Sequence, residues 1–443
     1  MQTELIPDRS TEQKLPSVVR NFLNLTLLFT GLSALYHLIE KFILHNHGHN
    51  VWPFTLNSYE HFRDFYVYAD RFQYFHAAGF FDFHNGTWPF VYPAPVAVVC
   101  EFFFHFMGRY STASFVCFCI LSFIVPAILF ARALRNRGIA VSTAAVFTII
   151  ILIFSWPALL IVDGANTEVI VWLALATGMW AYSTGRGWTA AAFFGVGAAL
   201  KLFPFVYLAL FFSTRQYKKL LFGIGVFLLV TVASLAILGP TIPQAAKGIL
   251  SGLDFFKHVY MEQWRSIENG VDHSLFAAIK FILVWFFHFP MTNLARPLAI
   301  YLPVTAVGGL LLYFLWIRRL PLLNQVITLT IASIYFTAFS GDGTLIHLYY
   351  GFAMLTFLAI DAHRKGLVIP GLNTAFACLA FLLSTESFFF HHGYRFEGQI
   401  KACVLAFLFV IALVRPFGPP VGEDNRDDAL ANPDSATWAD RHS

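Results

Sequence analysis

Apolar runs long enough to cross a lipid bilayer recur along the chain, separated by short polar connections. Examples are Phe22–Leu44, Ser111–Ala131 and Leu220–Leu238, each close to the roughly 20 residues that one membrane-spanning helix needs. The composition agrees, because 58% of the 443 residues are hydrophobic and only 12% are charged, against roughly 25% charged residues in soluble domains. The sequence therefore predicts an all-α polytopic membrane protein.

About 12 transmembrane helices are expected, together with juxtamembrane helices on the outer side. The other clear spans are Val141–Val162, Val169–Tyr182, Leu298–Ile317, Leu322–Phe339, Leu345–Ile360, Leu367–Leu383 and Ile400–Val414. Clusters of Lys and Arg mark the loops expected on the cytoplasmic side. These clusters are Arg9/Lys14/Arg20, Arg132/Arg135/Arg137, Arg215/Lys218/Lys219, Arg318/Arg319 and Arg364/Lys365.

Two loops on the same side of the membrane must be separated by an even number of membrane crossings. This requirement decides which of the ambiguous segments cross the membrane. Pro93–Met107 is expected to be an outer interfacial helix, because it is the shortest run between the first two clusters. Trp188–Phe212 is expected to be two short segments hinged near Lys201–Pro204, and Ser274–His288 an outer juxtamembrane helix. This arrangement places Asp64 outside.

The chain divides into three expected regions. Residues 1–20 form a cytoplasmic N-terminus, residues 21–415 the transmembrane domain, and residues 416–443 a charged, disordered cytoplasmic tail rich in Pro, Asp and Asn. Outer loops are expected at about residues 44–95 and 240–297. The net charge of +4 is spread over short connections, so no nucleic-acid partner is expected.

The first outer loop gathers aromatic side chains around a few carboxylates. It reads YEHFRDFYVYAD over residues 59–70 and FVYPAP over residues 90–95. We expect Asp64 to act as a general base that removes a proton from an attacking sugar hydroxyl, and Asp70, with the same spacing to a tyrosine, is the alternative base. Aromatic faces suit the C–H surface of a sugar ring. The simpler interpretation of Asp64 is a surface or capping carboxylate paired with Arg63.

Lys201 is a lone cation at the end of a small-residue run, GVGAALK over residues 195–201, and Pro204 follows it. Proline frees backbone groups and small residues let helices approach closely, which opens a niche beside the ammonium. That niche suits a lipid phosphate. The alternative is an ordinary lysine whose ammonium snorkels to the interface.

Two further polar turns are expected on the outer side. His347 opens a span and has Asp342 nearby, so both are candidates to bind phosphate or an acceptor hydroxyl. Residues 163–168 read DGANTE, which is most simply a turn and helix cap with an acid in the first helical turn. Contact with substrate hydroxyls is the other interpretation of Asn166 and Glu168.

The order of these motifs resembles glycosyltransferase family 87. Along roughly residues 22–350 the order is the acid-aromatic loop, F-x-Y-P-x-P, G-x-N, G-x-x-x-x-x-K-x-x-P, N-x-x-x-x-S-L and a late outer turn with Ser and His. The family comprises C-type enzymes, of the GT-C fold, related to polyprenyl-phosphate-mannose-dependent mannosyltransferases and to arabinofuranosyltransferases.

The resemblance carries over residue by residue. The family's catalytic aspartate matches Asp64, its Y-P-P motif matches Tyr92-Pro93-Ala94, and its K-x-x-P motif matches residues 201–204. Ala94 replaces the second proline of Y-P-P. The family's G-Q-x-N turn is compressed to Gly164-Ala165-Asn166.

Two later motifs of the family are altered further. Its N-Q-S-L loop is approximated by Asn269 and the later His273-Ser274-Leu275. Its S-P-x-S-W-x-H-H turn survives only as Ser340 and His347. These departures bear on the identity of the substrate more than on the fold.

The resemblance implies an inverting glycosyltransferase in a bacterial-type inner membrane, with its active site facing the periplasm. The donor would be a polyprenyl-phosphate sugar, carrying a mannose-like hexose or arabinofuranose, and the acceptor a hydroxyl of a glycolipid, a polysaccharide or another molecule. Asp64 would deprotonate the acceptor while Lys201 with His347 neutralises the departing phosphate. The remaining expected substrate-binding residues are Tyr92, Asn166, Glu168 and Asp342.

No cofactor and no metal are expected. The chain has no GxGxxG motif or P-loop placed between a strand and a helix, and no Asp-x-Asp pair for a metal-bound nucleotide sugar. His391 and His392 are adjacent but lack the further ligands of a metal site.

A transporter or flippase for a lipid-linked or anionic substrate is the alternative function. Such proteins use broken helices and buried charges near the bilayer midplane, commonly in two related halves. The segment near Lys201 fits this description, but no matching second half is found in the sequence. A scaffold or an inactive relative is a third interpretation, allowed by the altered motifs.

Overall fold

The computed structural model of the chain is almost wholly helical, as the apolar runs predict. It describes residues 14–43, 61–82, 89–263, 271–384, 390–391, 394–395 and 397–418. Within these residues the only strands are β1 (Phe390–His391) and β2 (Tyr394–Arg395), which pair antiparallel. The predicted all-α fold class is confirmed.

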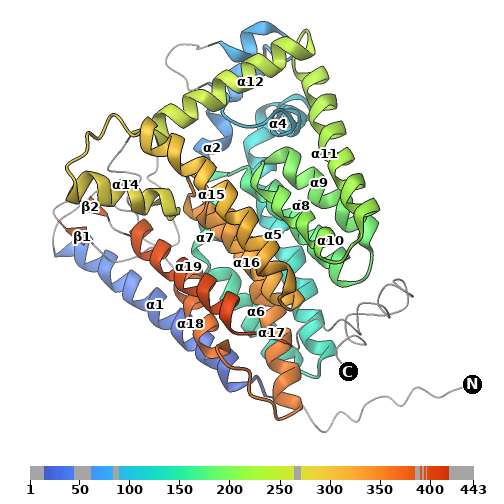
Figure 1. Ribbon diagram of the computed structural model, residues 1–443, viewed down its shortest axis with the longest axis vertical. Helices are drawn as coiled ribbons and strands as arrows, with labels where there is room; N and C mark the ends of the chain where they lie inside the picture. The colour runs from blue at the N-terminus through green and yellow to red at the C-terminus, as the bar shows by residue number, and fades with distance from the viewer. Residues whose placement is uncertain are drawn as a thin grey trace, which may run out of the picture.

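Figure 1 shows how the helices of the described residues are arranged. In chain order they are α1 (Ser17–Phe42), α2 (Arg63–Tyr66), α3 (Ala69–Phe72), η1 (Ala78–Phe81), α4 (Ala94–Met107), η2 (Gly108–Tyr110), α5 (Ser111–Asn136), α6 (Val141–Ile153), α7 (Trp156–Gly164), α8 (Glu168–Ser183), α9 (Gly187–Leu200), η3 (Phe203–Leu208), α10 (Ala209–Ser213), α11 (Tyr217–Leu238), α12 (Ile242–Phe256), η4 (Lys257–Met261), α14 (Leu275–Phe286), α15 (Ala295–Leu315), η5 (Ile317–Arg319), α16 (Leu322–Tyr335), η6 (Asp342–His347), α17 (Leu348–Arg364), α18 (Leu372–Leu383) and α19 (Glu397–Val414).

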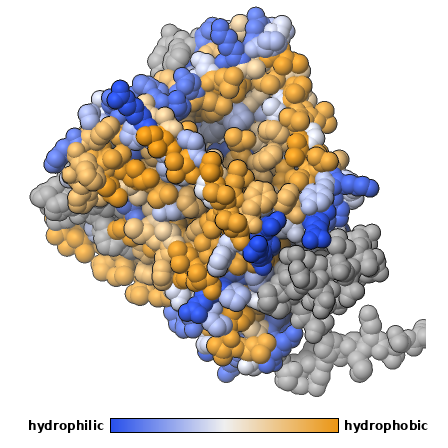
Figure 2. Space-filling model, in the orientation of Figure 1, coloured by the Kyte–Doolittle hydropathy of each residue, from blue (hydrophilic) through white to orange (hydrophobic). Residues whose placement is uncertain are grey.

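Many of these helices are suited to a membrane. In the described part of the chain, five are long and apolar enough to cross a bilayer, or six if one bent pair is a single span, and several shorter apolar helices accompany them. Hydrophobic residues cover most of the face seen in Figure 2, while hydrophilic residues gather around α12 and at the opposite end. The chain is a polytopic integral membrane protein.

The predicted span Val141–Val162 is wrong as a single helix. The structure breaks it into α6 and α7, which are bent by 56°. The hydroxyl of Ser155 accepts a 3.2 Å hydrogen bond from the amide of Ala158, and Pro157 lies in the first turn of α7. A capping serine and an early proline favour a new helix N-terminus, so α7 starts in its own direction.

Of two other segments, one is hinged as predicted and one is continuous with its neighbour. Pro93–Met107 forms helix α4, but η2 joins it directly to α5, so that Ala94–Asn136 is a single apolar segment of 43 residues. The segment Trp188–Phe212 is hinged, because α9 ends at Leu200 and Lys201 is extended with φ −153° and ψ 137°. Which membrane face these segments occupy stays a prediction.

The ends of the chain lie partly outside the described residues. α1 begins at Ser17, inside the region 1–20 expected to be a cytoplasmic N-terminus. Residues 419–443, which make up most of the predicted tail, are not among the described residues.

Buried apolar side chains form two large clusters. One joins the aromatic residues within 61–82 and 89–104 to α8, α9 and α10, with Phe65 and Phe211 among its members. The other joins α1 to the C-terminal helices α16–α19. α16 contributes to both, because Val326 lies in the first cluster and Ile327 in the second. The two clusters therefore meet along α16, beside the polar residues of α8 and η6.

Small residues let α9 approach its neighbours closely. A Cβ atom added at Gly195 would clash with the carbonyl oxygen of Gly223 on α11, and one added at Gly178 would clash with the ring of Phe194. Such contacts are typical of membrane helices that pack through small side chains. This packing fixes the end of α9, where Lys201 lies.

Candidate active site

A hydrogen bond joins the first loop to the turn before α8. The side-chain amide of Asn166 donates to Oδ2 of Asp64 over 2.6 Å, and Oδ1 of Asn166 accepts from the backbone amide of Glu168 over 2.8 Å. Asn166 therefore forms the turn that leads into α8, whose N-cap residue is Thr167, and it also holds Asp64. The first loop and the G-x-N turn meet in space.

The backbone around this contact takes an uncommon conformation. Phe62 and Ala165 both have positive φ values, 60° and 49° respectively. Residues other than glycine adopt this left-handed backbone conformation at a cost of about 1–3 kcal/mol, and such residues cluster at functional sites. Phe62 precedes α2, which carries Asp64, and Ala165 precedes Asn166, so local strain is concentrated where the two meet.

The loop is also tied to the end of α7. The backbone amide of Phe62 donates to the carbonyl oxygen of Asp163 over 2.7 Å. Nδ1 of His61 lies 2.5 Å from Oδ1 of Asp163. Together with the Asn166 contact, these bonds fix the position of Asp64, which is half-buried.

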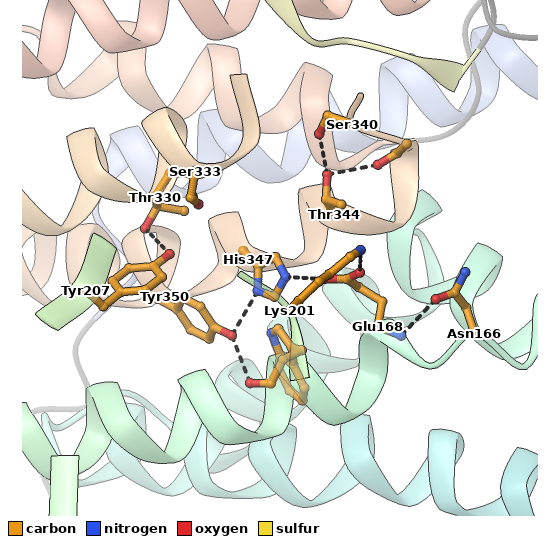
Figure 3. A network of polar contacts seen from close by, with 12 residues as sticks. Asn166, Glu168, Lys201, Tyr207, Thr330, Ser333, Ser340, Thr344, His347 and Tyr350 are labelled. Carbon is orange, nitrogen blue, oxygen red and sulfur yellow. Dashed lines mark hydrogen bonds and ion pairs between the residues drawn. The ribbon is translucent and has the colours of Figure 1, made fainter. Parts of the chain in front are cut away.

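Glu168 is the centre of the next part of the network (Figure 3). Its side chain is only 4% exposed, and Oε2 accepts a hydrogen bond from the ammonium of Lys201. Oε1 lies 2.7 Å from Nε2 of His347. Glu168 is therefore the shared acceptor of Lys201 and His347, which come from distant segments, and the sequence interpretation of a first-turn acid was incomplete.

His347 is fully buried, and both of its ring nitrogens have a polar neighbour. Nδ1 lies 3.1 Å from the hydroxyl of Tyr350, which in turn donates to the carbonyl oxygen of Trp172 over 2.8 Å. The carboxylate of Glu168 can only accept, so Nε2 of His347 donates to it. Lys201 and His347 therefore both donate to Glu168, and we call these three side chains the cationic group.

Lys201 stays within reach of solvent or of a ligand. Its side chain is 34% exposed despite the ion pair with Glu168. Its ammonium also lies 5.5 Å from the ring centre of Phe203, whose ring is 5.2 Å from that of His347. The cationic group thus has one accessible member.

Two phenols lie beside Asp64. The rings of Tyr68 and Tyr92 pack edge to face with centres 5.9 Å apart, and Tyr92 bonds the side chain of Thr167. Burial raises the pKa of both phenols, and the negative charge of Asp64 raises each pKa further. Both hydroxyls therefore remain neutral hydrogen-bond donors at physiological pH.

Asp70 makes only local contacts in the described residues. It is exposed on α3, and its backbone carbonyl oxygen accepts a 2.8 Å hydrogen bond from the side chain of Gln73. The structure does not bring it into the network that contains Asn166 and Glu168.

Asp342 belongs to a second buried cluster, not to the surroundings of His347 as the sequence analysis expected. Its Oδ2 accepts from the ammonium of Lys401 over 2.6 Å and from the indole of Trp156 over 2.7 Å. Nδ1 of His273 lies 3.4 Å from its Oδ1. The reason is the turn η6, whose six residues rise by about 10 Å and carry Asp342 and His347 at opposite ends.

Asp272 completes this second cluster. Its Oδ1 accepts from the backbone amides of Ser340 and Ser274, each over 3.0 Å. Its Oδ2 lies 3.9 Å from the ammonium of Lys280, and both side chains are fully buried. The two altered motifs at residues 273–275 and 340–347 therefore meet in space; Asn269 lies outside the described residues.

The sequence analysis missed several members of these clusters. Lys280 and Lys401 were counted within apolar segments, although a lone charge in such a segment is itself a sign of a paired or functional residue. Tyr350 and Asp272 carry no sequence signal that distinguishes them from ordinary residues.

No metal site is built by the part of the chain that the structure describes. Its residues contain no group of three or more His, Cys, Asp or Glu side chains arranged to hold a metal ion. The side chains of His391 and His392 are not among those described, so the expectation of no metal stays a prediction.

Comparison with known proteins decides the family. The sequence model of glycosyltransferase family 87 matches residues 90–341, more than half of the chain. The chain belongs to glycosyltransferase family 87. This confirms the resemblance noted in the sequence, and no curated protein matches the chain significantly.

Membership in family 87 makes the protein a glycosyltransferase. The matched range contains Tyr92, Asn166, Glu168 and Lys201, whereas Asp64 and His347 lie outside it. Both of these are joined to the matched range by direct contacts, Asp64 through Asn166 and His347 through Glu168.

Proposed function

We propose that this family 87 glycosyltransferase moves a sugar from a polyprenyl-phosphate donor to an acceptor hydroxyl in one inverting step. The observation that carries the proposal is the unbroken series of contacts from Asp64 through Asn166 and Glu168 to Lys201 and His347. It brings two carboxylates, one lysine and one histidine from distant segments to a single place.

Asp64 acts as the general base in this proposal. Its carboxylate is held by the amide of Asn166 and is half-buried, which leaves it able to accept a proton from an acceptor hydroxyl. A positioned base contributes about 10²- to 10⁴-fold to a rate. Asp70 is the weaker candidate, because it is exposed and makes only local contacts in the described residues.

A mechanism with one displacement, and no covalent intermediate, is favoured because Glu168 is not free to act as a nucleophile. Both oxygens of Glu168 are engaged, one by Lys201 and one by His347, so Glu168 is a poor nucleophile. Asp64 then serves one role, the removal of the proton, and the acceptor oxygen attacks the anomeric carbon directly. The bond to the phosphate oxygen breaks as the new glycosidic bond forms, which inverts the anomeric centre.

Lys201 and His347 stabilise the departing phosphate. Both side chains donate to Glu168, and the ammonium of Lys201 is the accessible member of the group. Fixed charges in a site with little water stabilise negative charge that develops during reaction. Tyr92 and Asn166 line the same place, and the aromatic first loop suits a mannose-like hexose or arabinofuranose. We assign no cofactor or metal to the reaction.

The positions of the basic clusters support a site on the outer, periplasmic side of a bacterial-type inner membrane. Arg364 donates to the carbonyl oxygen of Arg137, so two of the predicted cytoplasmic clusters meet. A Cβ atom added at Gly187 would contact Lys219, which places a third cluster near the end of α8. Glu168 lies at the other end of that 16-residue helix, about 24 Å away.

A transporter or flippase remains the second candidate. The broken pair α6 and α7 and the buried lysines of the second cluster are features that such proteins share. Catalysed transfer separates the two functions, because a flippase leaves the donor's glycosidic bond intact.

The test uses membranes that contain wild type, Asp64→Asn or Asp70→Asn protein. Each is incubated with radiolabelled polyprenyl-phosphate mannose or polyprenyl-phosphate arabinofuranose and a membrane extract that supplies glycolipid and polysaccharide acceptors. We expect wild type and Asp70→Asn to transfer label and Asp64→Asn to lose at least 100-fold. Equal transfer by wild type and Asp64→Asn would overturn the role of Asp64, and movement of intact donor without transfer would favour the flippase.

A further inference from the structure

Three aromatic rings form a separate group near the first loop. The ring centres of Phe256 and Tyr260 are 4.7 Å apart, and Phe339 lies 5.5 Å from Phe256 and 5.2 Å from Tyr260. All three side chains are half-buried. Rings in the apolar core of this protein are buried far more completely. Part of the surface of each of these three rings therefore remains accessible to a ligand.

The backbone that carries Tyr260 is a π-helical turn. η4 follows α12 directly, and the amide of Glu262 donates to the carbonyl oxygen of Lys257, five residues earlier, over 3.0 Å. Single π turns of this kind are rare and are found frequently at functional sites. The fully buried ammonium of Lys280 donates to the carbonyl oxygen of Tyr260 over 2.9 Å. The turn is therefore held in place from inside the protein.

The aromatic group borders the surroundings of Asp64. Ile249, Gly252 and Phe256 are spaced three and four residues apart, so they share one face of α12. A Cβ atom added at Gly252 would clash with the carbonyl oxygen of Phe90, which shows how closely this face lies on the first loop. The ring of Phe90 is 5.1 Å from that of Tyr68, the phenol beside Asp64. Figure 2 shows the surface hollowed below α12.

Polar side chains flank the rings along the chain. Lys257, next to Phe256, pairs with Glu262, two residues beyond Tyr260, over 2.8 Å. Apolar ring faces with a rim of hydrogen-bonding groups match a sugar, whose C–H face is apolar and whose edge carries hydroxyls. A polyprenyl chain would instead require an apolar surface without this rim.

We propose that Phe256, Tyr260 and Phe339 form a stacking platform for a sugar ring of the acceptor. That the platform binds a sugar is inferred from the rings and their polar neighbours. That this sugar belongs to the acceptor rests on the proposed transferase function. Phe90 and Tyr68 lie between the platform and Asp64 on one side. Asn166 and Glu168 join Asp64 to the cationic group on the other. An acceptor stacked there would present a hydroxyl to the base from the side opposite the phosphate.

The test measures binding without catalysis. Purified protein in nanodiscs is mixed with the methyl glycosides of mannose, glucose, galactose and arabinofuranose, and saturation-transfer NMR records contact with the sugar ring protons. We expect a signal from at least one glycoside with wild type and with Tyr260→Phe, which keeps the aromatic face. The double variant Phe256→Leu/Tyr260→Leu keeps apolar bulk and removes the faces, and we expect it to lose at least fivefold of the signal.

Two results would overturn the platform. One is an unchanged signal in the double leucine variant, and the other is no signal from any of the four glycosides with wild type. The melting temperature of each variant is recorded, and a single leucine substitution replaces the double variant if the latter unfolds. Asp64→Asn is expected to keep the signal, so loss of transfer with retained sugar contact would count against the proposed base and not against the platform.

Discussion

The side-chain amide of Asn166 donates a 2.6 Å hydrogen bond to Asp64, 102 positions earlier in the sequence. Two residues beyond Asn166, Glu168 bonds both Lys201 and His347. One short turn therefore touches the proposed base on one side and the proposed phosphate-binding cations on the other. The geometry of the reaction, in this account, is set by residues 165–168.

Replacing Asn166 with alanine tests that turn. The charged form of Asp64 loses a hydrogen bond, and bonds to charged groups contribute about 1.5–3 kcal/mol. We expect kcat to fall about 10- to 100-fold and the acid limb of the pH–rate profile to move to higher pH, because ionised Asp64 is less stabilised. Asp70→Asn is the control. An unchanged profile with Asn166→Ala would show that the contact has no part in catalysis.

Glu168→Gln removes the carboxylate to which Lys201 and His347 both donate. Breaking a buried ion pair costs about 3–5 kcal/mol; we expect roughly 2 kcal/mol here, because Lys201 is 34% exposed and water screens its charge. The melting temperature should fall by several degrees, and adding Lys201→Met should restore part of the loss. A single variant as stable as wild type would contradict the assigned contacts.

Lys401→Met tests the second cluster, where neither partner can reach water. Lys401 and Asp342 are each only 1% exposed at the side chain, so the substitution leaves a buried carboxylate without its counter-ion and should cost about 3–5 kcal/mol. The double variant Lys401→Met/Asp342→Asn should be clearly more stable than the single one. Lys257→Met, at an exposed pair, should cost under about 1 kcal/mol. Equal losses for Lys401→Met and Lys257→Met would refute a buried pair.

Gly252→Ala tests the contact between α12 and the first loop. The added methyl group would clash with the backbone carbonyl of Phe90, which cannot move aside as a flexible side chain could. We expect α12 to shift, with a loss of transfer and of stability. Gly225→Ala is the matched control, because nothing lies within 4 Å of its Cβ position and alanine favours a helix by about 1 kcal/mol. Two variants with the same behaviour would contradict the close packing at Gly252.

Sequence reasoning predicted the elements that depend on local signals. The hinge at Lys201 was predicted because Pro204 follows it, and the structure has the break there. The expected topology also placed Asp64, Asn166 and Lys201 on the same side of the membrane. The break between α6 and α7 was missed because the apolar run over residues 141–162 predicts a single span. Ser155 and Pro157 nevertheless form a recognisable helix start.

The contacts among charges could not be predicted in the same way. Whether Lys201 pairs with Glu168 depends on how closely α8 and α9 pack, and the pairing of Asp342 with Lys401 depends on the approach of α19 to η6. These are relations between segments 33 and 59 residues apart, and sequence spacing says nothing about them. The same holds for Tyr260, whose position depends on a π turn supported by Lys280.

A structure determined by cryo-electron microscopy with added polyprenyl phosphate tests the central claim most directly. The account predicts phosphate density within hydrogen-bonding distance of the ammonium of Lys201, with Asp64 facing the space next to it. Density at the basic end of the molecule near Lys219, or anywhere away from Lys201 and His347, would contradict it.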